Sequence, residues 1–420
     1  MTKGVKRVSK RKRLLGILSL VCLGMTIGFS ISSQAEVKQP IKIGIIGPMT
    51  GLFSAMGEPM GKGALLAAKL INEEKGGILG RKVEILIRDD EMRPAISIRM
   101  ARELNKQHGV YLFGGVNSSA NVLALKPVME EMNSLIQVGA ESSKITGKDW
   151  SPNIFRLSYD NITVGYAAAE LLHQKFPQIK KWATIGPDYE YGHNCVEFFI
   201  EKLKELDPSV EVVIQRWPKF GAGGGYGSHI NAIMATEAEG LFSSLFGGDV
   251  IAFIREAKPF GLFNKLKVYG NGHMDWDNPY ALKKDMCEIW AHELYYGPAY
   301  NYPMSEKFEK GMIKTYGEDY FKVSQGHAMA TFETVYAYKA AIEKAKSFKV
   351  EDIRKALENL TFDSPHGKKT IRAGDHQAFF DIVFYHIVPD PKEEVGWRID
   401  SWTLIDGRKY SLTPEERRKR

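Results

Sequence analysis

Two serines, Ser118 and Ser119, which come directly after Asn117, are the first candidates for ligand chemistry. They follow a short apolar run at residues 110–113 and two glycines, and they precede an apolar-periodic segment at residues 122–132. That order predicts a strand, a tight loop and the N-terminus of a helix. Because the first N–H groups of a helix lack partners and carry partial positive charge, they can hold a carboxylate together with two hydroxyl groups. The alternative is that one of the serines only caps the helix.

Two acid–histidine pairs, His273 with Asp275 and His292 with Glu293, have the residue types of metal ligands or of a general base. No nucleophile or third ligand lies near either pair in the sequence, which favours a hydrogen-bonding or surface role. The glycine-rich segment at residues 221–227 lacks the Lys-Ser/Thr of a phosphate-binding loop and is expected to be flexible. The acids at residues 89–91 are expected to be solvated. We therefore expect no enzyme activity, no metal and no cofactor.

The first 35 residues have the pattern of a secretory signal peptide. Seven Lys and Arg residues precede an uncharged apolar stretch at residues 14–31, and Ser33, Gln34 and Ala35 offer a cleavage site before Glu36. An uncleaved membrane anchor is the alternative, because the apolar stretch is long for a signal peptide. Without the seven basic residues, 50 basic residues face 50 acidic ones, so the mature chain has no excess positive charge for nucleic acid. These features predict a periplasmic protein.

The mature part of the chain keeps two cysteines, Cys195 and Cys287. They could pair in an oxidising compartment, although nothing in their spacing requires a disulfide.

Apolar runs alternate with helical patterns in two series. The first series predicts strands at residues 41–46, 82–88, 110–113 and 134–138 and helices at residues 59–74, 94–107 and 122–132. After a crossing strand at residues 151–156, the second predicts helices at residues 163–175, 192–205, 229–236 and 250–257 and strands at residues 182–185, 210–216, 240–245 and 266–269. The C-terminal third predicts helices at residues 306–316, 325–344 and 350–360 and a strand at residues 379–388. The alternation predicts two α/β lobes with mostly parallel sheets.

The chain resembles the type I periplasmic binding proteins of ABC importers, in particular the branched-chain amino-acid (Leu/Ile/Val) subgroup. The stretches that carry the resemblance are IKIGIIGPMTG, NEEKGGILGRKVEIL, RDDEMRP, FGGVNSS and IGPDYEYGHN. The resemblance implies two Rossmann-like lobes joined by three crossovers, with a ligand enclosed between them by hinge closure. We expect lobe 1 at residues 36–155 and 298–365, lobe 2 at residues 156–297 and 366–410, crossings near residues 151–158, 295–302 and 365–370, and a polar tail at residues 411–420.

The resemblance also implies a ligand site. In lobe 1, Ser118 and main-chain groups of Gly139, Ala140 and Glu141 would hold the ligand carboxylate, with Ser119 capping the helix and Met56 in the first loop. In lobe 2, the facing residues would be Tyr191, Phe246 and the loop that holds Gly272, His273 and Asp275. Tyr191 and Phe246 could instead be core aromatic residues.

Three positions depart from the family pattern. Gly272 stands where members that bind an α-amino acid have an acidic residue, and Met56 replaces an aromatic one. Glu141 stands where a small hydroxyl residue is common, and its carboxylate would repel a ligand carboxylate unless it turns away, is protonated or pairs with a cation. The ligand is then either an amine or amide held by Glu141 or Asp275, or a carboxylate without an amine, and we favour the first.

The resemblance implies a monomeric solute-binding protein that delivers an amino acid or a related carboxylate or amide to ABC permease membrane subunits. The alternative is an extracytoplasmic ligand-sensing module that acts through a separate membrane receptor.

Overall fold

The computed structural model of the protein describes residues 38–420. The predicted signal peptide and its cleavage site lie outside these residues. Within them, no helix is both long and apolar enough to cross a membrane.

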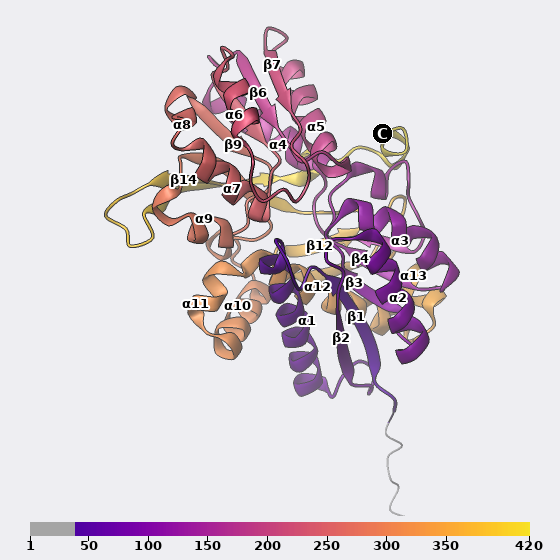
Figure 1. Cartoon of the computed structure of the whole chain (residues 1–420). Coiled ribbons are helices and arrows are strands. Elements are labelled where there is room, and N and C mark those ends of the chain that lie inside the picture. Colours follow the sequence, from indigo (N-terminus) through magenta and orange to yellow (C-terminus); the bar gives the residue numbers. More distant parts are fainter. Residues whose placement is uncertain (1–37) are drawn as a thin grey trace, which may run out of the picture. The chain divides into compact units, whose positions relative to one another are not determined.

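The first lobe is built on a five-stranded parallel sheet with the order β2-β1-β3-β4-β5. Its strands are β1 (Ile41–Gly47), β2 (Val83–Asp89), β3 (Leu112–Gly115), β4 (Leu135–Val138) and β5 (Ile154–Arg156). Its helices are α1 (Ser54–Lys75), α2 (Pro94–His108), α3 (Ser119–Glu131), α10 (Pro303–Tyr316), α11 (Glu318–Val323), α12 (Gln325–Ala345) and α13 (Val350–Leu357). Strands β3 and β4 are buried along their whole length, as expected for a parallel sheet covered on both faces. Helix α12 comes late in the chain but packs along α1 (Figure 1).

The second lobe is built on a seven-stranded sheet with the order β15-β14-β10-β9-β8-β6-β7. Strands β6 to β10 pair in parallel, and β14 and β15 extend the sheet as antiparallel strands. Its strands are β6 (Lys181–Ile185), β7 (Glu211–Arg216), β8 (Gly240–Ser243), β9 (Val268–Asn271), β10 (Ile289–Glu293), β14 (Asp381–Pro389) and β15 (Trp397–Asp406). Its helices are α4 (Asn161–Lys175), α5 (Glu190–Leu206), α6 (Gly227–Met234), α7 (Gly247–Ala257), α8 (Leu262–Lys265) and α9 (Asp277–Leu282).

The chain passes between the two sheets three times, after β5, after β10 and before β14. The last passage includes a small three-stranded sheet of β11 (Thr361–Ser364), β12 (Gly367–Ile371) and β13 (Ala378–Phe379). An isolated parallel bridge joins Arg156 at the first passage to Gln377 at the last. The predicted class, α/β with two mostly parallel sheets in two lobes, is confirmed.

Helix α1 begins earlier than the sequence predicted. The prediction started it at Pro59, a residue type that is favoured at the first position of a helix. The helix begins instead at Ser54 and contains Pro59. Met56, which was expected in a loop, is therefore in the first turn of α1.

The last residues of the chain differ from the predicted polar tail. Helix α14 (Pro414–Arg417) begins at a capping box formed by Thr413 and Glu416. The side chain of Arg417 is fully buried and forms ion pairs with Asp160 and Asp375. The tail is therefore partly a structural element.

Two other expectations are corrected by the structure, and some elements were not predicted. Cys195 and Cys287 are both free and buried, so they do not pair. Among the three acids expected to be solvated, Asp90 is fully buried and accepts hydrogen bonds from Ser97 and Asn121. Strands β10, β11, β12 and β15 and the short helices α8, α9 and α11 were not predicted.

Candidate ligand-binding site

A narrow pocket lies between the two lobes and is partly open to solvent. Its walls are formed by Met56, Asn117, Gly139, Glu141, Tyr189, Tyr191, Phe246, His273, Leu294, His327 and Ala330. Most of these residues follow the carboxyl end of a strand of either sheet. In open α/β sheets this is the edge at which ligands bind.

The loop after β3 places Asn117, rather than the two serines, at the pocket. Ser118 is the N-cap of α3, and its hydroxyl accepts from the backbone N–H of Asn121 at 3.4 Å. The hydroxyl of Ser119 accepts from the backbone N–H of Ser142 at 3.2 Å. The prediction that Ser119 caps the helix is therefore wrong. Strand β3 ends at Gly115, two residues later than predicted, and α3 begins at Ser119, three residues earlier than predicted.

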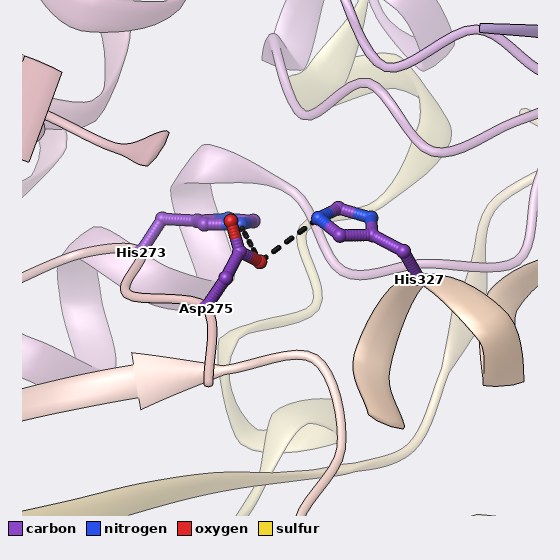
Figure 2. A group of neighbouring side chains, drawn as sticks. All are labelled: His273, Asp275 and His327. Atoms are coloured by element: carbon purple, nitrogen blue, oxygen red, sulfur yellow. Dashed lines mark hydrogen bonds and ion pairs between the residues drawn. The ribbon is translucent and has the colours of Figure 1, made fainter. Parts of the chain in front are cut away.

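Four buried titratable side chains form a chain of contacts across the pocket. His273 donates from Nδ1 to Glu141 Oε1 at 2.8 Å and from Nε2 to Asp275 Oδ1 at 2.9 Å. His327 Nε2 lies 2.9 Å from the same Asp275 oxygen, as Figure 2 shows. Each of the four residues is at most 6% exposed. We call these residues the pocket cluster.

The pocket cluster connects the two lobes. Glu141 follows β4, and His327 is in the first turn of α12, so both belong to the first lobe. His273 and Asp275 lie between β9 and α9 in the second lobe. The contacts between Glu141 and His273 and between Asp275 and His327 therefore join the lobes directly.

The pKa values of His273 and Asp275 depend mainly on their burial and on the charges of the other residues in the pocket cluster. Burial lowers the pKa of His273, but the charges of Asp275 and Glu141 outweigh it and hold that pKa well above its ordinary value. Burial raises the pKa of Asp275, but His327 and His273 bring it well below the usual range. The neighbouring Glu293 is also buried. Its burial and, second, the negative charge of Asp275 raise the pKa of Glu293 well above the ordinary value. Contact with the two acids therefore favours the charged form of His273, and burial beside Asp275 favours the neutral form of Glu293.

Several polar atoms of the pocket have no hydrogen-bond partner among the described residues. They are Glu141 Oε2, Asp275 Oδ2 and the hydroxyl of Tyr191. Leaving such a buried atom unpaired costs about 1–3 kcal/mol. No Lys or Arg is among the described residues that line the pocket. The arrangement is therefore suited to a solute or ion that supplies hydrogen-bond donors or positive charge.

Aromatic rings form the other wall of the pocket. Phe53, which precedes α1 in the first lobe, stacks on Phe220 with a centroid separation of 5.1 Å and lies 5.3 Å from Phe246. Tyr191 meets Phe246 edge to face at 5.3 Å. The family pattern has an aromatic residue at the position of Met56. Phe53, three residues earlier in this chain, supplies an aromatic ring in the same region.

The structure brings together some of the predicted site residues and leaves others outside. Six of them line the pocket: Met56, Gly139, Glu141, Tyr191, Phe246 and His273. Asp275 lies behind His273, whereas Ser118, Ser119, Ala140 and Gly272 do not line it. A Cβ at Gly272 would lie 2.9 Å from the sulfur of Cys195, so this position faces the interior of the second lobe.

Five lining residues were not predicted: Asn117, Tyr189, Leu294, His327 and Ala330. Asn117 and Tyr189 each lie within two residues of a predicted site residue, so a wider interpretation of the same loops would have included them. His327 and Ala330 are on a helix far along the chain, and their spacing gives no sign of the pocket.

Comparison with known proteins identifies related chains. The family model described as periplasmic binding protein matches residues 40–392. A leucine-, isoleucine-, valine-, threonine- and alanine-binding protein from Pseudomonas aeruginosa is 24% identical over 392 residues, which covers 92% of this chain and 97% of that protein.

Solved structures share the fold. An amino acid ABC transporter substrate-binding protein from Pseudomonas fluorescens Pf-5 has a TM-score of 0.75 and 22% identity, covering 87% of this chain and 96% of that one. A solute-binding protein from Rhodopseudomonas palustris HaA2 in complex with p-hydroxybenzoic acid has a TM-score of 0.76 and 19% identity, covering 87% and 98%. At these identities the likeness concerns the fold alone.

Proposed function

This chain belongs to the periplasmic binding protein family, and we propose that it captures a small polar solute between its lobes and delivers it to the permease of an ABC importer. The observation that carries the proposal is a pocket whose walls come from both lobes and whose polar atoms are incompletely paired. Such a pocket gains most of its contacts when the lobes close, and a ligand shifts the equilibrium by its preference for the closed form.

We propose that the solute is an amino acid or a related carboxylate or amide that carries at least one N–H donor. The unpaired oxygens of Glu141 and Asp275 are acceptors, and ionised carboxylates accept hydrogen bonds only. The rings of Tyr189, Tyr191 and Phe246 offer apolar cover to the rest of the solute.

The competing solute class is an aromatic carboxylate without an amine. It is favoured by the aromatic wall, and the protein from Rhodopseudomonas palustris was solved with such a ligand. In that case Glu141 Oε2 would remain unpaired beside a second negative charge, which is unfavourable in a buried site.

A thermal-shift screen of amino acids, amides and organic acids, followed by calorimetry of the hits, tests the proposal. We expect stabilisation by at least one N–H-bearing solute, and weaker binding of that solute to Glu141→Gln. Stabilisation only by amine-free acids, undiminished in Glu141→Gln, would contradict the solute class. Mass spectrometry of solutes that co-purify with the protein provides an unbiased second measurement.

Delivery to a permease is tested in cells. Uptake of the identified solute should fall when the chain is deleted and return when it is restored. Unchanged uptake with confirmed binding would instead support the sensing role.

A further inference from the structure

We propose that His273, Asp275 and His327 bind one divalent transition-metal ion at the inner wall of the pocket, and that the solute completes the coordination of this ion. The three side chains offer ligand atoms that all lie within 4.8 Å of one another. Figure 2 shows both imidazole rings directed toward the same carboxylate, whose Oδ1 lies 2.9 Å from each Nε2. The site goes beyond the proposed function, which requires no metal.

The ligand types suit zinc and its neighbours in the first transition row. Two imidazoles and one carboxylate bind such ions with bonds of about 2.0–2.2 Å, so ligand atoms in a tetrahedral site lie roughly 3.3 Å apart. The nitrogen–oxygen distances of 2.9 Å need to open by only a few tenths of an ångström. Three protein ligands leave a fourth position, and it faces the pocket because His273 and His327 line it.

Neighbouring side chains hold both rings with Nε2 toward the ion. Glu141 Oε1 accepts from Nδ1 of His273 at 2.8 Å, which is the carboxylate–histidine contact typical of metal sites. The amide of Asn117 lies 3.0 Å from Nδ1 of His327. When the Asn117 amide is flipped by about 180°, its oxygen accepts a hydrogen bond from the Nδ1–H of His327.

Unpaired atoms give independent support for a bound ion. Asp275 Oδ2 is buried without a hydrogen-bond partner among the described residues, and His327 Nε2, also buried, has only the ion-pair contact with Asp275 Oδ1. A divalent ion would bind the nitrogen and balance the charges of Asp275 and Glu141, in a pocket whose described lining includes no Lys or Arg.

The ion would also connect the lobes. His327 is on α12 of the first lobe, whereas His273 and Asp275 follow β9 in the second. A metal bound by ligands from both lobes stabilises their closed arrangement. A solute with a carboxylate or amine can then occupy the open coordination position.

Calorimetric titration of the chelator-treated protein with zinc tests the site, and the visible absorption spectrum of the cobalt-loaded protein reports its geometry. We expect one ion per chain. Because loss of an outer-shell partner typically costs 10–100-fold, Glu141→Gln should weaken zinc binding by about that factor, and His327→Gln and Asp275→Asn by more. The matched control is His193→Gln, since His193 pairs with Asp188 on the surface and should not contribute to the affinity.

Two results would overturn the metal site: no stoichiometric zinc uptake by the wild type, or equal affinity in the wild type, His327→Gln and Asp275→Asn. Asp275→Asn keeps the shape of the side chain, and circular dichroism establishes that each variant is folded. Solute affinity is then compared with and without zinc. Equal affinity refutes the role of the ion in solute binding and leaves solute capture intact, whereas no solute binding in either state contradicts the proposed function instead.

Discussion

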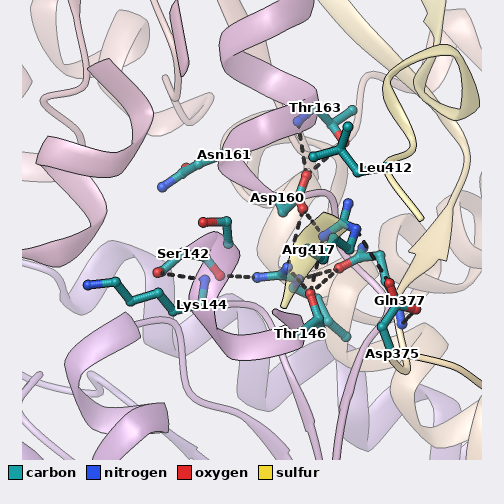
Figure 3. Close-up of polar contacts among 12 residues, drawn as sticks. Ser142, Lys144, Thr146, Asp160, Asn161, Thr163, Asp375, Gln377, Leu412 and Arg417 are labelled. Carbon is teal, nitrogen blue, oxygen red and sulfur yellow. Dashed lines mark hydrogen bonds and ion pairs between the residues drawn. The ribbon is translucent and has the colours of Figure 1, made fainter. Parts of the chain in front are cut away.

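Two groups of charged side chains are equally buried in this protein but differ in how their atoms are paired. The pocket cluster contains Glu141, His273, Asp275 and His327. The second group, the crossover cluster, contains Arg156, Asp160, Asp375 and Arg417, all with fully buried side chains. It lies where the first and last passages between the sheets meet the end of the chain (Figure 3).

In the crossover cluster each carboxylate is paired with guanidinium groups. Arg417 pairs with Asp160 and lies 3.4 Å from Asp375, and Arg156 lies 3.5 Å from Asp160. Burial raises the pKa of Asp160, but Arg417 and Arg156 lower it to about 2. Arg156 and Arg417 therefore face the two carboxylates, Arg372 pairs with Asp375 as a third guanidinium, and Asp160 stays charged over the physiological range.

The pocket cluster has histidines in place of arginines, and both of its acids keep one oxygen without a partner. Equal burial therefore does not distinguish a structural charge cluster from a binding site. The distinction comes from acids that lack full pairing, because an unpaired buried acceptor is unfavourable until a ligand satisfies it.

The largest effect is expected from Arg417→Ala. Removing this side chain leaves Asp160 and Asp375 buried with one guanidinium fewer, and breaking a buried ion pair typically costs about 3–5 kcal/mol. Denaturant unfolding of the unliganded protein measures the loss. Arg420→Ala is the matched control, because Arg420 pairs with Glu201 near the surface and such pairs contribute at most about 1 kcal/mol. Equal losses in the two variants would show that the crossover cluster is not structural.

The next effect is a pH dependence of stability through Asp160. Its folded-state pKa of about 2 lies below the ordinary value of 3.8, so its contribution is fully present above pH 4 and is lost as the pH falls through 2. The free energy of unfolding of wild type should exceed that of Asp160→Asn at neutral pH. This difference should shrink by roughly 2 kcal/mol toward pH 2. A difference that is independent of pH would contradict the pairing of Asp160 with the arginines.

Glu141→Gln should affect binding more than folding. Its carboxylate keeps one unpaired oxygen, and loss of a charged hydrogen bond of about 1.5 kcal/mol weakens binding of an N–H-bearing solute about tenfold. Calorimetry gives the affinity and denaturant unfolding gives the stability. We expect a smaller loss of stability than in Asp160→Asn, because His273 keeps Asp275 as a partner. A larger loss of stability in Glu141→Gln than in Asp160→Asn would contradict the distinction between the two clusters.

The fold could be predicted from local patterns in the sequence. Apolar runs and helical periodicity located most strands and helices, since each depends on neighbouring residues. The strand loops that hold Glu141, Tyr191 and His273 followed from the same patterns. Strand β15 could also have been found, because its alternating burial matches the alternation of apolar and polar residues at its sequence WRIDSWTLID.

The missed features depend on contacts between distant parts of the chain. His327 meets Asn117 across 210 residues, and no local pattern shows this approach. Arg417 looked like part of a solvated tail because arginine is rarely fully buried without a partner. Its partners, Asp160 and Asp375, come from other segments, and the fold alone brings them together.

The smallest effect on solute affinity is expected from Tyr191→Phe. This variant tests directly whether an unpaired buried atom marks a ligand contact. The Tyr191 hydroxyl is buried in the pocket and has no hydrogen-bond partner among the described residues, so its removal should not lower the stability of the unliganded protein. If the solute pairs with this hydroxyl, the variant should lose about 0.5–1.5 kcal/mol of binding, a two- to tenfold change. Tyr269→Phe is the control, because its hydroxyl is also buried and unpaired but lies outside the pocket. Calorimetry that found equal solute affinity in both variants and wild type would show that the Tyr191 hydroxyl is only a packing feature.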